Sequence, residues 1–424
     1  MIPYKTQPNS IRPFPMLAGL GVLASLSASS FAEPLTFSTF HQRVLDEAPV
    51  GVALRAKAEA DLHGANTLGG LDSTSIEVEF EGFGGDATDG AGEITGLVKQ
   101  PLPRPGELSA TRALRNSSRL VASIEQEARY RALCRELAGT YFGALAAGER
   151  QARHQDALKH AAQVQEIMER QLEGGSVASF DLLQAREFQA DITREADLSK
   201  IAATTADQRL LGWLDESEVQ AEDPSWTTPP LLPGEVELAR AFAAAPEVRV
   251  VDAEVDEARA SLRLSKASRW PAWGAAFGLR EDQETGEQTY VAAIELELPF
   301  RKADRSSRRE AEARLRAATA SREQARRSRV VDTSARIREL ASEREALTRL
   351  LEVRLPAIDK RRKLAQLLHT QGEITTLELL DTQETWLSLH DEAIDLKLSY
   401  RLRLAALHLD CPCNSLLPEE EATK

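Results

Sequence analysis

The sequence predicts a mainly α-helical fold with a small β part, built from two similar halves. Long tracts rich in Ala, Leu, Glu, Arg and Gln contain almost no glycine or proline, a composition typical of long helices and coiled coils. One short phrase occurs twice, around Gly175 and Gly372. Four short segments alternate between apolar and other residues, which indicates half-buried β-strands.

Each half is predicted to contain a helix, two strands, a very long helix, the glycine phrase and a further helix. Pro49 and Pro246 stand 197 positions apart, as do Gly175 and Gly372, so the chain reads as a tandem duplication. Acidic residues and four prolines after position 214 mark a linker. The predicted units are a signal peptide (1–32), a first repeat (33–214), the linker (215–236), a second repeat (237–410) and an irregular tail (411–424).

The first 32 residues have the features of a signal peptide. Lys5 and Arg12 precede an apolar stretch over residues 14–26, and small residues follow up to Ala32. The stretch is too short to span a bilayer as a mature helix. We therefore expect export, with Glu33 as the first mature residue; a buried N-terminal helix is the alternative.

The overall charge and the reactive residues limit the classes of function. With 66 acidic against 52 basic residues, the chain has no basic field for a nucleic acid, so we expect no nucleic-acid partner. The histidines show no helix-spaced metal motif, and no nucleophile, base and orienting group occur together. We expect no enzyme activity, no cofactor and no recognisable metal centre. Cys134, Cys411 and Cys413 are odd in number, and we interpret the last two as incidental thiols rather than a soft-metal site or strained link.

The strands of both halves alternate between apolar and acidic side chains. Three glutamates, Glu77, Glu79 and Glu81, alternate with apolar residues in the first half, and Glu295 and Glu297 do so in the second. Each strand therefore has one apolar face and one acidic face. Because a small sheet with two open edges is marginal, something must close it. Copies from neighbouring subunits can form a barrel with an apolar outer band and these five glutamates on its lumen wall; a soluble sandwich edge is the alternative.

The helical tracts are unusually long. Residues 107–172 contain no proline and can run for about 100 Å as a helix with a narrow, Ala-rich stripe that suits coiled-coil packing. A second tract over residues 305–370 is expected to kink at Pro356. Both tracts end at the glycine phrase.

The glycine phrase predicts the tip of a helical hairpin. Gly175 and Gly372 can end one helix through a left-handed conformation, and the hydroxyls of Ser179 and Thr376 stand where they can cap the next. Asp181 and Glu378 place negative charge in the first turn, so capping alone explains these carboxylates. The functional interpretation is that the exposed tips form a docking surface. Besides the two glycines, it would consist of Val177, Asp181, Leu183, Ile374, Glu378 and Leu380.

These features resemble the TolC-like outer-membrane efflux protein family over essentially the whole mature chain. The phrases "GSVASFDLLQA" and "GEITTLELLDT" carry the resemblance, while "IEVEFEGFGG", "GEITGLVKQPL" and "LELPFRKADRSSRREAEAR" resemble its heavy-metal, CzcC-like branch. The resemblance implies a homotrimer in which four strands per subunit contribute to a twelve-stranded outer-membrane β-barrel and the helices form a periplasmic α-barrel. It implies as partners a periplasmic adaptor (membrane fusion) protein, an inner-membrane RND-type pump and outer-membrane lipid.

We therefore expect a passive exit duct in the outer membrane, with heavy-metal cations as the substrate class that the branch implies. The alternative is an exported coiled-coil adaptor or scaffold, which would leave the amphipathic strands without a partner. Two features depart from the family pattern. Ile374 stands where the second tip often carries an arginine, which places a gate held by that ion pair in doubt. The run "PLPRPGELSATR" stands where the branch usually has a Gly-Gly-Lys-Arg-like sequence.

Overall fold

The computed structural model of the chain describes residues 35–68, 73–82, 92–175, 178–215, 221–243, 245–283, 285–297 and 302–407. The predicted signal peptide, Val177, Cys411, Cys413 and the predicted tail lie outside these residues.

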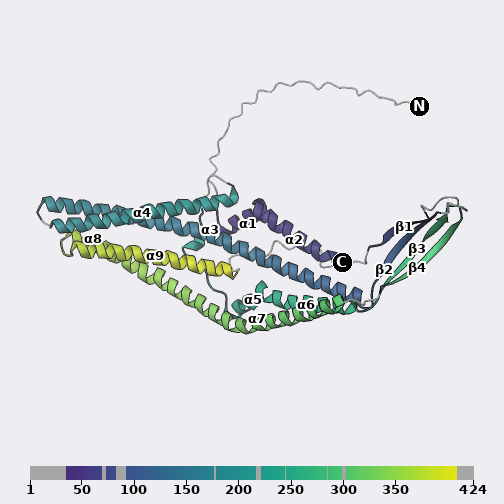
Figure 1. The fold of residues 1–424 in the computed structure, drawn as a ribbon. Helices are drawn as coiled ribbons and strands as arrows, with labels where there is room; N and C mark the ends of the chain where they lie inside the picture. The colour runs from purple at the N-terminus through teal and green to yellow at the C-terminus, as the bar shows by residue number, and fades with distance from the viewer. Residues whose placement is uncertain are drawn as a thin grey trace, which may run out of the picture. The chain divides into compact units, whose positions relative to one another are not determined.

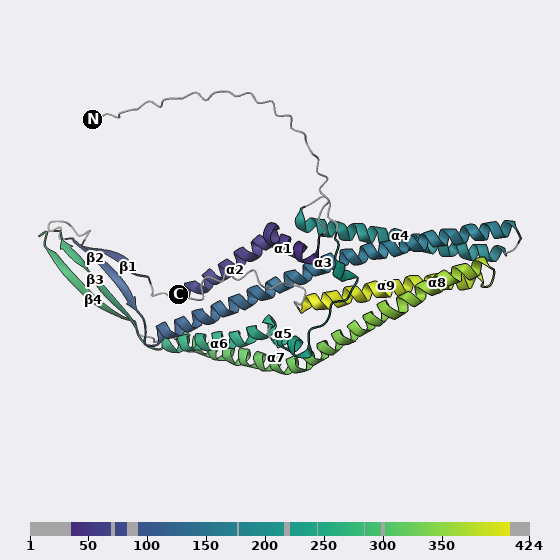
Figure 2. The same cartoon turned by 180° about the vertical axis from the view of Figure 1, so that it is seen from behind.

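The same order of elements occurs twice along the chain (Figures 1 and 2). The first series is α1 (Phe37–Glu47), α2 (Pro49–Thr67), β1 (Ser75–Glu81), β2 (Glu93–Leu102), α3 (Glu107–Glu173) and α4 (Ser179–Leu214). After a short 3-10 turn, Pro224–Trp226, the second series is α5 (Glu235–Ala243), α6 (Pro246–Ala267), β3 (Ala272–Asp282), β4 (Gln288–Glu297), α7 (Lys302–Arg349), a π-helical turn (Leu350–Arg354), α8 (Leu355–Thr370) and α9 (Thr376–Ala406). The mainly α-helical fold class with a small β part is confirmed.

The four strands form one antiparallel sheet in the order β1-β2-β3-β4. The two strands of each half pair with each other, and β2 pairs with β3 to join the halves. Among the described residues, β1 and β4 have one strand partner each, so the sheet keeps two free edges. Along the chain β2 precedes α3, β3 follows α6 and β4 precedes α7, so the sheet lies next to the starts of α3 and α7 and the end of α6 (Figure 1).

Close approach of two strands requires a glycine at position 278. A Cβ atom built there would lie 1.8 Å from the Gly96 carbonyl oxygen on β2, whereas one built on Gly274 of the same strand would lie 3.4 Å from the Glu295 Cβ atom. Gly278→Ala is therefore expected to break the β2-β3 pairing and to weaken the antiparallel amide I band in the infrared spectrum of the purified protein, since only the β1-β2 and β3-β4 pairs remain. Gly274→Ala is the matched control and should leave that band unchanged; an unchanged band in both variants would contradict the prediction.

The long helix α3 is the element on which the others pack. It has 67 residues, about 100 Å of helix. Arg129 of α3 forms an ion pair with Asp61 of α2, and Glu127 pairs with Arg249 of α6. Beyond these, α3 runs along α4 and α9 (Figures 1 and 2). A single helix of this length is stable only because partners cover it along its whole length.

A π-helical turn, Leu350–Arg354, lies next to Pro356, where a kink is expected. Proline has no N–H and its ring clashes with the carbonyl of the preceding turn. The π-helical turn lies immediately before α8, in which Pro356 is at the first turn. The extra residue in that turn accommodates the missing hydrogen bond, so the tract continues as α8 instead of ending.

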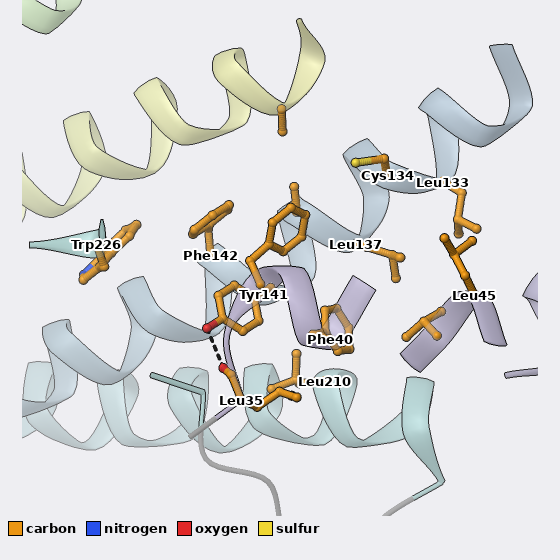
Figure 3. Packing of buried hydrophobic residues seen from close by; sticks show 14 of the residues in the cluster. Leu35, Phe40, Leu45, Leu133, Cys134, Leu137, Tyr141, Phe142, Leu210 and Trp226 are labelled. Atoms are coloured by element: carbon orange, nitrogen blue, oxygen red, sulfur yellow. Dashed lines mark hydrogen bonds between the residues drawn. The ribbon is translucent and has the colours of Figure 1, made fainter. Parts of the chain in front are cut away.

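An aromatic core joins the N-terminal helices to the linker (Figure 3). Phe40 of α1 stacks on Tyr141 of α3, and Phe142 stacks on Trp226 of the 3-10 turn. The Tyr141 hydroxyl donates a 2.6 Å hydrogen bond to the Leu35 carbonyl. Cys134 is fully buried here and is disulfide-bonded. Disulfides are typical of exported chains.

Candidate functional site

The sheet has one face on which apolar side chains gather. Directly opposite residues in antiparallel strands share a face, so the strand register assigns each side chain. The apolar face contains Ile76, Val78, Phe80, Ile94, Val98, Trp273, Phe277, Leu279, Tyr290, Ile294 and Leu296. Ile76 is 78% exposed and Ile294 79% exposed, and Phe277 stacks on Tyr290 across the strands. An exposed apolar patch of this kind marks an interaction site.

The opposite face is polar, and the register places all five predicted glutamates on it. Glu77, Glu79 and Glu81 of β1 share this face with Glu295 and Glu297 of β4. The alternation seen in the sequence is therefore kept in space. Their exposure to a lumen stays a prediction.

The polar face also contains residues that the sequence analysis missed. Glu93, Lys99, Arg280 and Asp282 lie on it by register. Lys99 forms an ion pair with Glu77, and Arg280 pairs with Glu93 at 3.1 Å. Among the paired strand residues the face thus has seven carboxylates against two cations. The same period-two rule, applied to residues 92–100 and 272–282, would have identified these four.

Both hairpin tips turn through a left-handed glycine, as expected. Gly175 has φ of 71° and Gly372 has φ of 75°. Asp181 lies in the first turn of α4, and its Oδ2 accepts a 3.3 Å hydrogen bond from the Ala178 N–H. Ser179 is the first helical residue and makes no cap, so the predicted role of its hydroxyl was wrong.

The second tip is capped by a different threonine from the one expected. Thr375 Oγ1 accepts from the Glu378 N–H at 3.3 Å, and Glu378 Oε2 accepts from the Thr375 N–H at 2.8 Å. The hydrogen bond from the Thr375 backbone N–H contributes most to lowering the pKa of Glu378, and the hydrogen bond with the Thr375 side chain lowers it further. Thr376 is instead buried, with its hydroxyl 3.2 Å from Met168 Sδ. The sequence alone does not show which of the two adjacent threonines is the cap, because the choice depends on the residue at which the helix begins.

The structure exposes a different set of apolar residues at the tips from the one predicted. Leu183 is 60% exposed, but Leu380 is 6% exposed and packs in a cluster with Met168, so Leu380 offers no contact surface. Ile374 is partly buried against the same cluster. The exposed pair is Phe180 (64%) and Leu377 (60%), which occupy equivalent positions in the two phrases. We define Phe180, Leu183 and Leu377 as the tip patch.

Polar contacts that the sequence analysis did not anticipate join α3 to α8 and α9. Arg362 of α8 donates to Asp156 of α3 at 2.8 Å. His154 and Arg150 of α3 both contact Asp391 of α9, each at 3.1 Å. The hydrogen bond with Asp391 raises the pKa of His154. These contacts hold the two hairpins together with paired charges.

A partly buried carboxylate, that of Glu149, connects the linker to α3 and α9. Glu149 Oε2 accepts from Trp226 Nε1 at 2.8 Å, and Lys397 Nζ donates to the two Glu149 oxygens at 3.0 and 2.9 Å. Burial opposes ionisation of Glu149, but Lys397 and Trp226 outweigh it and hold the pKa of Glu149 below its ordinary value.

The described residues contain no group of three or more His, Cys, Asp or Glu side chains that could hold a metal ion. Within the same residues, none of the helices combines the length and the hydropathy that crossing a bilayer requires.

Known structures share this fold. No protein-family model matches the chain, and no curated protein matches it. Among solved structures, CusC superposes with a TM-score of 0.71 at 16% identity over 88% of this chain and 90% of CusC. CusC changes conformation as it folds and forms a transmembrane channel. The Campylobacter jejuni CmeC outer membrane channel gives 0.67 at 13% identity over 95% and 93% of the two chains. The Neisseria gonorrhoeae MtrE outer membrane channel gives 0.66 at 15% identity over 88% of each. These neighbours are channel proteins rather than enzymes, and the chain has the fold that they share.

Proposed function

We propose that this protein is the outer-membrane channel of a tripartite efflux system and acts as a passive exit duct without chemistry of its own. The observation that carries the proposal is the two-sided sheet. Its exposed apolar face requires an apolar environment, and its acidic face requires water. A lipid-facing outer wall and an aqueous lumen meet both requirements, while a soluble scaffold would leave the apolar face in water.

Closing the four-stranded sheet into a barrel requires further copies of the chain, and we propose a homotrimer. The free edges of β1 and β4 can pair between neighbours, so three sheets of four strands would form a twelve-stranded barrel without edges. The similarity to CmeC and MtrE, two outer membrane channels, supports a channel that lies in the outer membrane.

The helices also have exposed apolar surfaces through which neighbouring subunits of the trimer can contact one another. On α4, Leu198 and Ile201 are exposed; Val353, Leu364 and Leu367 are exposed on the π-helical turn and α8. Exposed charges of both signs flank the α4 stripe, including the bases Arg194 and Lys200, whereas mainly bases flank the α8 stripe. Exposed acids on α4 include Glu187, Asp191 and Asp197, and exposed bases on α8 include Lys360, Arg361 and Lys363. Contact between α4 of one subunit and α8 of the next would bury both stripes and pair these charges.

The proposed partners act at the two ends of the duct. The sheet would lie in outer-membrane lipid, and the tips would meet a periplasmic adaptor that delivers substrate from an inner-membrane RND-type pump. Residues 33–214 and 237–410 would be the two repeats of an ancestral unit. The excess of carboxylates on the polar face favours cations, so heavy-metal cations are the substrate class that we propose.

Conductance of the purified full-length protein in a planar bilayer tests the duct and its lining together. We expect stepwise channels that prefer cations at neutral pH. The double variant Glu295→Gln and Glu297→Gln should shift the reversal potential in a salt gradient towards zero, because it removes lumen charge. Glu281→Gln is the matched control, since Glu281 lies on the opposite face by register and should leave the potential unchanged. Absence of channels would contradict the duct, and anion preference would contradict the acidic lining.

A further inference from the structure

Basic side chains gather where the helices meet the sheet. Arg263, Lys266 and Arg269 lie at the end of α6 and just after it, within nine residues of the first residue of β3. Arg305, Arg308 and Arg309 lie in the first turns of α7, shortly after β4. All six are exposed, and α6 packs against α7. We define these six residues as the basic collar.

The collar contrasts with the rest of the chain in its charge. The chain has a net charge of −14, yet no acidic residue occurs from position 258 to position 270. Arg308 pairs with Glu312 at 3.3 Å. In the described part of the chain, Arg263, Lys266, Arg305 and Arg309 make no ion pair. Four unpaired cations on adjacent helices repel one another, so an anionic partner at this place would relieve an unfavourable field.

Two exposed tryptophans lie close to the basic collar, where β3 begins. Trp270 and Trp273 are exposed at the start of β3, and Arg269 lies with its guanidinium carbon 5.4 Å from the centre of the Trp270 ring. Trp273 belongs to the apolar face. Exposed indoles beside an apolar band are typical of the boundary between a bilayer and water, and arginines at that depth reach the lipid phosphates.

We propose that the basic collar binds the phosphate groups of anionic phospholipid at the bilayer surface on the helical side of the sheet. The contact would fix the depth of the sheet in the membrane. This inference rests on the proposed function, because it requires the apolar face to be inserted in lipid. Each basic residue near an anionic membrane surface favours association by about fivefold, and the effect declines within one Debye length.

Quenching of tryptophan fluorescence by brominated phospholipid measures this preference. The full-length protein is reconstituted into vesicles with acyl-brominated phosphatidylglycerol or acyl-brominated phosphatidylcholine at varied fractions, and relative association is read from the quenching of the exposed tryptophans. We expect phosphatidylglycerol to associate at least about fivefold more strongly than phosphatidylcholine. Raising the salt concentration to about 0.5 M should reduce this ratio, because screening shortens the reach of the charges.

The triple variant Arg305→Gln, Arg308→Gln and Arg309→Gln should lower the ratio by about fivefold or more, because it removes three of the six collar charges. The control triple Arg336→Gln, Arg338→Gln and Arg349→Gln makes the same charge change on α7, about 40 Å or more further along the helix, and should retain the ratio. Circular dichroism and cross-linking verify that both variants fold and assemble. Equal association of the two lipids with the unaltered protein, or an equal fall of the ratio in both triple variants, would contradict binding of anionic phospholipid by the basic collar. Quenching by neither lipid would instead overturn insertion, and with it the proposed function.

Discussion

Replacing both Phe180 and Leu377 with aspartate is expected to abolish efflux while leaving the fold intact. Each side chain is more than half exposed at the hairpin tips, and neither contributes to a buried cluster. Burying an apolar side chain of this size at an interface contributes about 1.5–3 kcal/mol, and an aspartate in its place adds the cost of desolvating a charge. The double change should therefore weaken adaptor docking by at least about a hundredfold.

Drug or metal tolerance of cells that carry the variant in place of the original chain measures the loss, and cross-linking to the adaptor shows where it arises. Leu231→Asp is the matched control, since Leu231 is 80% exposed in the linker, away from the tips in sequence, and should not alter tolerance. Leu380→Asp should lower the amount of folded protein instead, because Leu380 is buried. Normal efflux by the double variant, at normal protein level, would remove the tip patch from the docking surface.

The contrast between Leu183 and Leu380 shows where sequence reasoning stops. The two leucines occupy equivalent positions of the repeated phrase, so the sequence predicts one environment for both. In the structure α9 packs against α3, α7 and α8, whereas α4 packs mainly on α3. Because α9 is covered by more helices than α4, a position of α9 can be buried while the equivalent position of α4 is exposed. Burial at a tip is therefore a property of tertiary packing, which a repeat in the sequence does not contain.

The period of the strands and the positions of the glycines, in contrast, predicted the sheet faces and the hairpin turns correctly. The alternation around Glu77 and Glu295 depends on a period of two that every strand imposes, and the left-handed turns at Gly175 and Gly372 depend on the absence of a Cβ atom. The bridge from Arg150 to Asp391 spans 241 positions of sequence, and no periodic pattern relates its two members. Such long-range polar pairs become visible only when the helices are placed side by side.

Replacing Glu149 with alanine is the second change with a large expected effect, a loss of about 3–5 kcal/mol of unfolding free energy. Lys397 is 8% exposed, and Glu149 is the carboxylate that its ammonium contacts, at 2.9 and 3.0 Å. Removing that carboxylate leaves a buried charge and also takes the acceptor from the Trp226 indole. Urea unfolding of the purified protein in detergent, followed by tryptophan fluorescence, measures the change.

The double variant Glu149→Gln and Lys397→Met separates the unpaired charge from simple loss of packing. It removes both charges and should recover most of the stability that Glu149→Ala loses, because breaking a buried pair costs more than replacing it. The pH dependence gives an independent check. Because the pKa of Glu149 is lower in the folded protein than in the unfolded chain, its stabilisation is complete above the ordinary glutamate range near pH 4.5 and is lost as pH falls through the folded value. Glu149→Ala should therefore lose stability less steeply in acid than the unaltered protein. If both lost it equally, the Glu149–Lys397 pair would not be what holds the linker to α3 and α9.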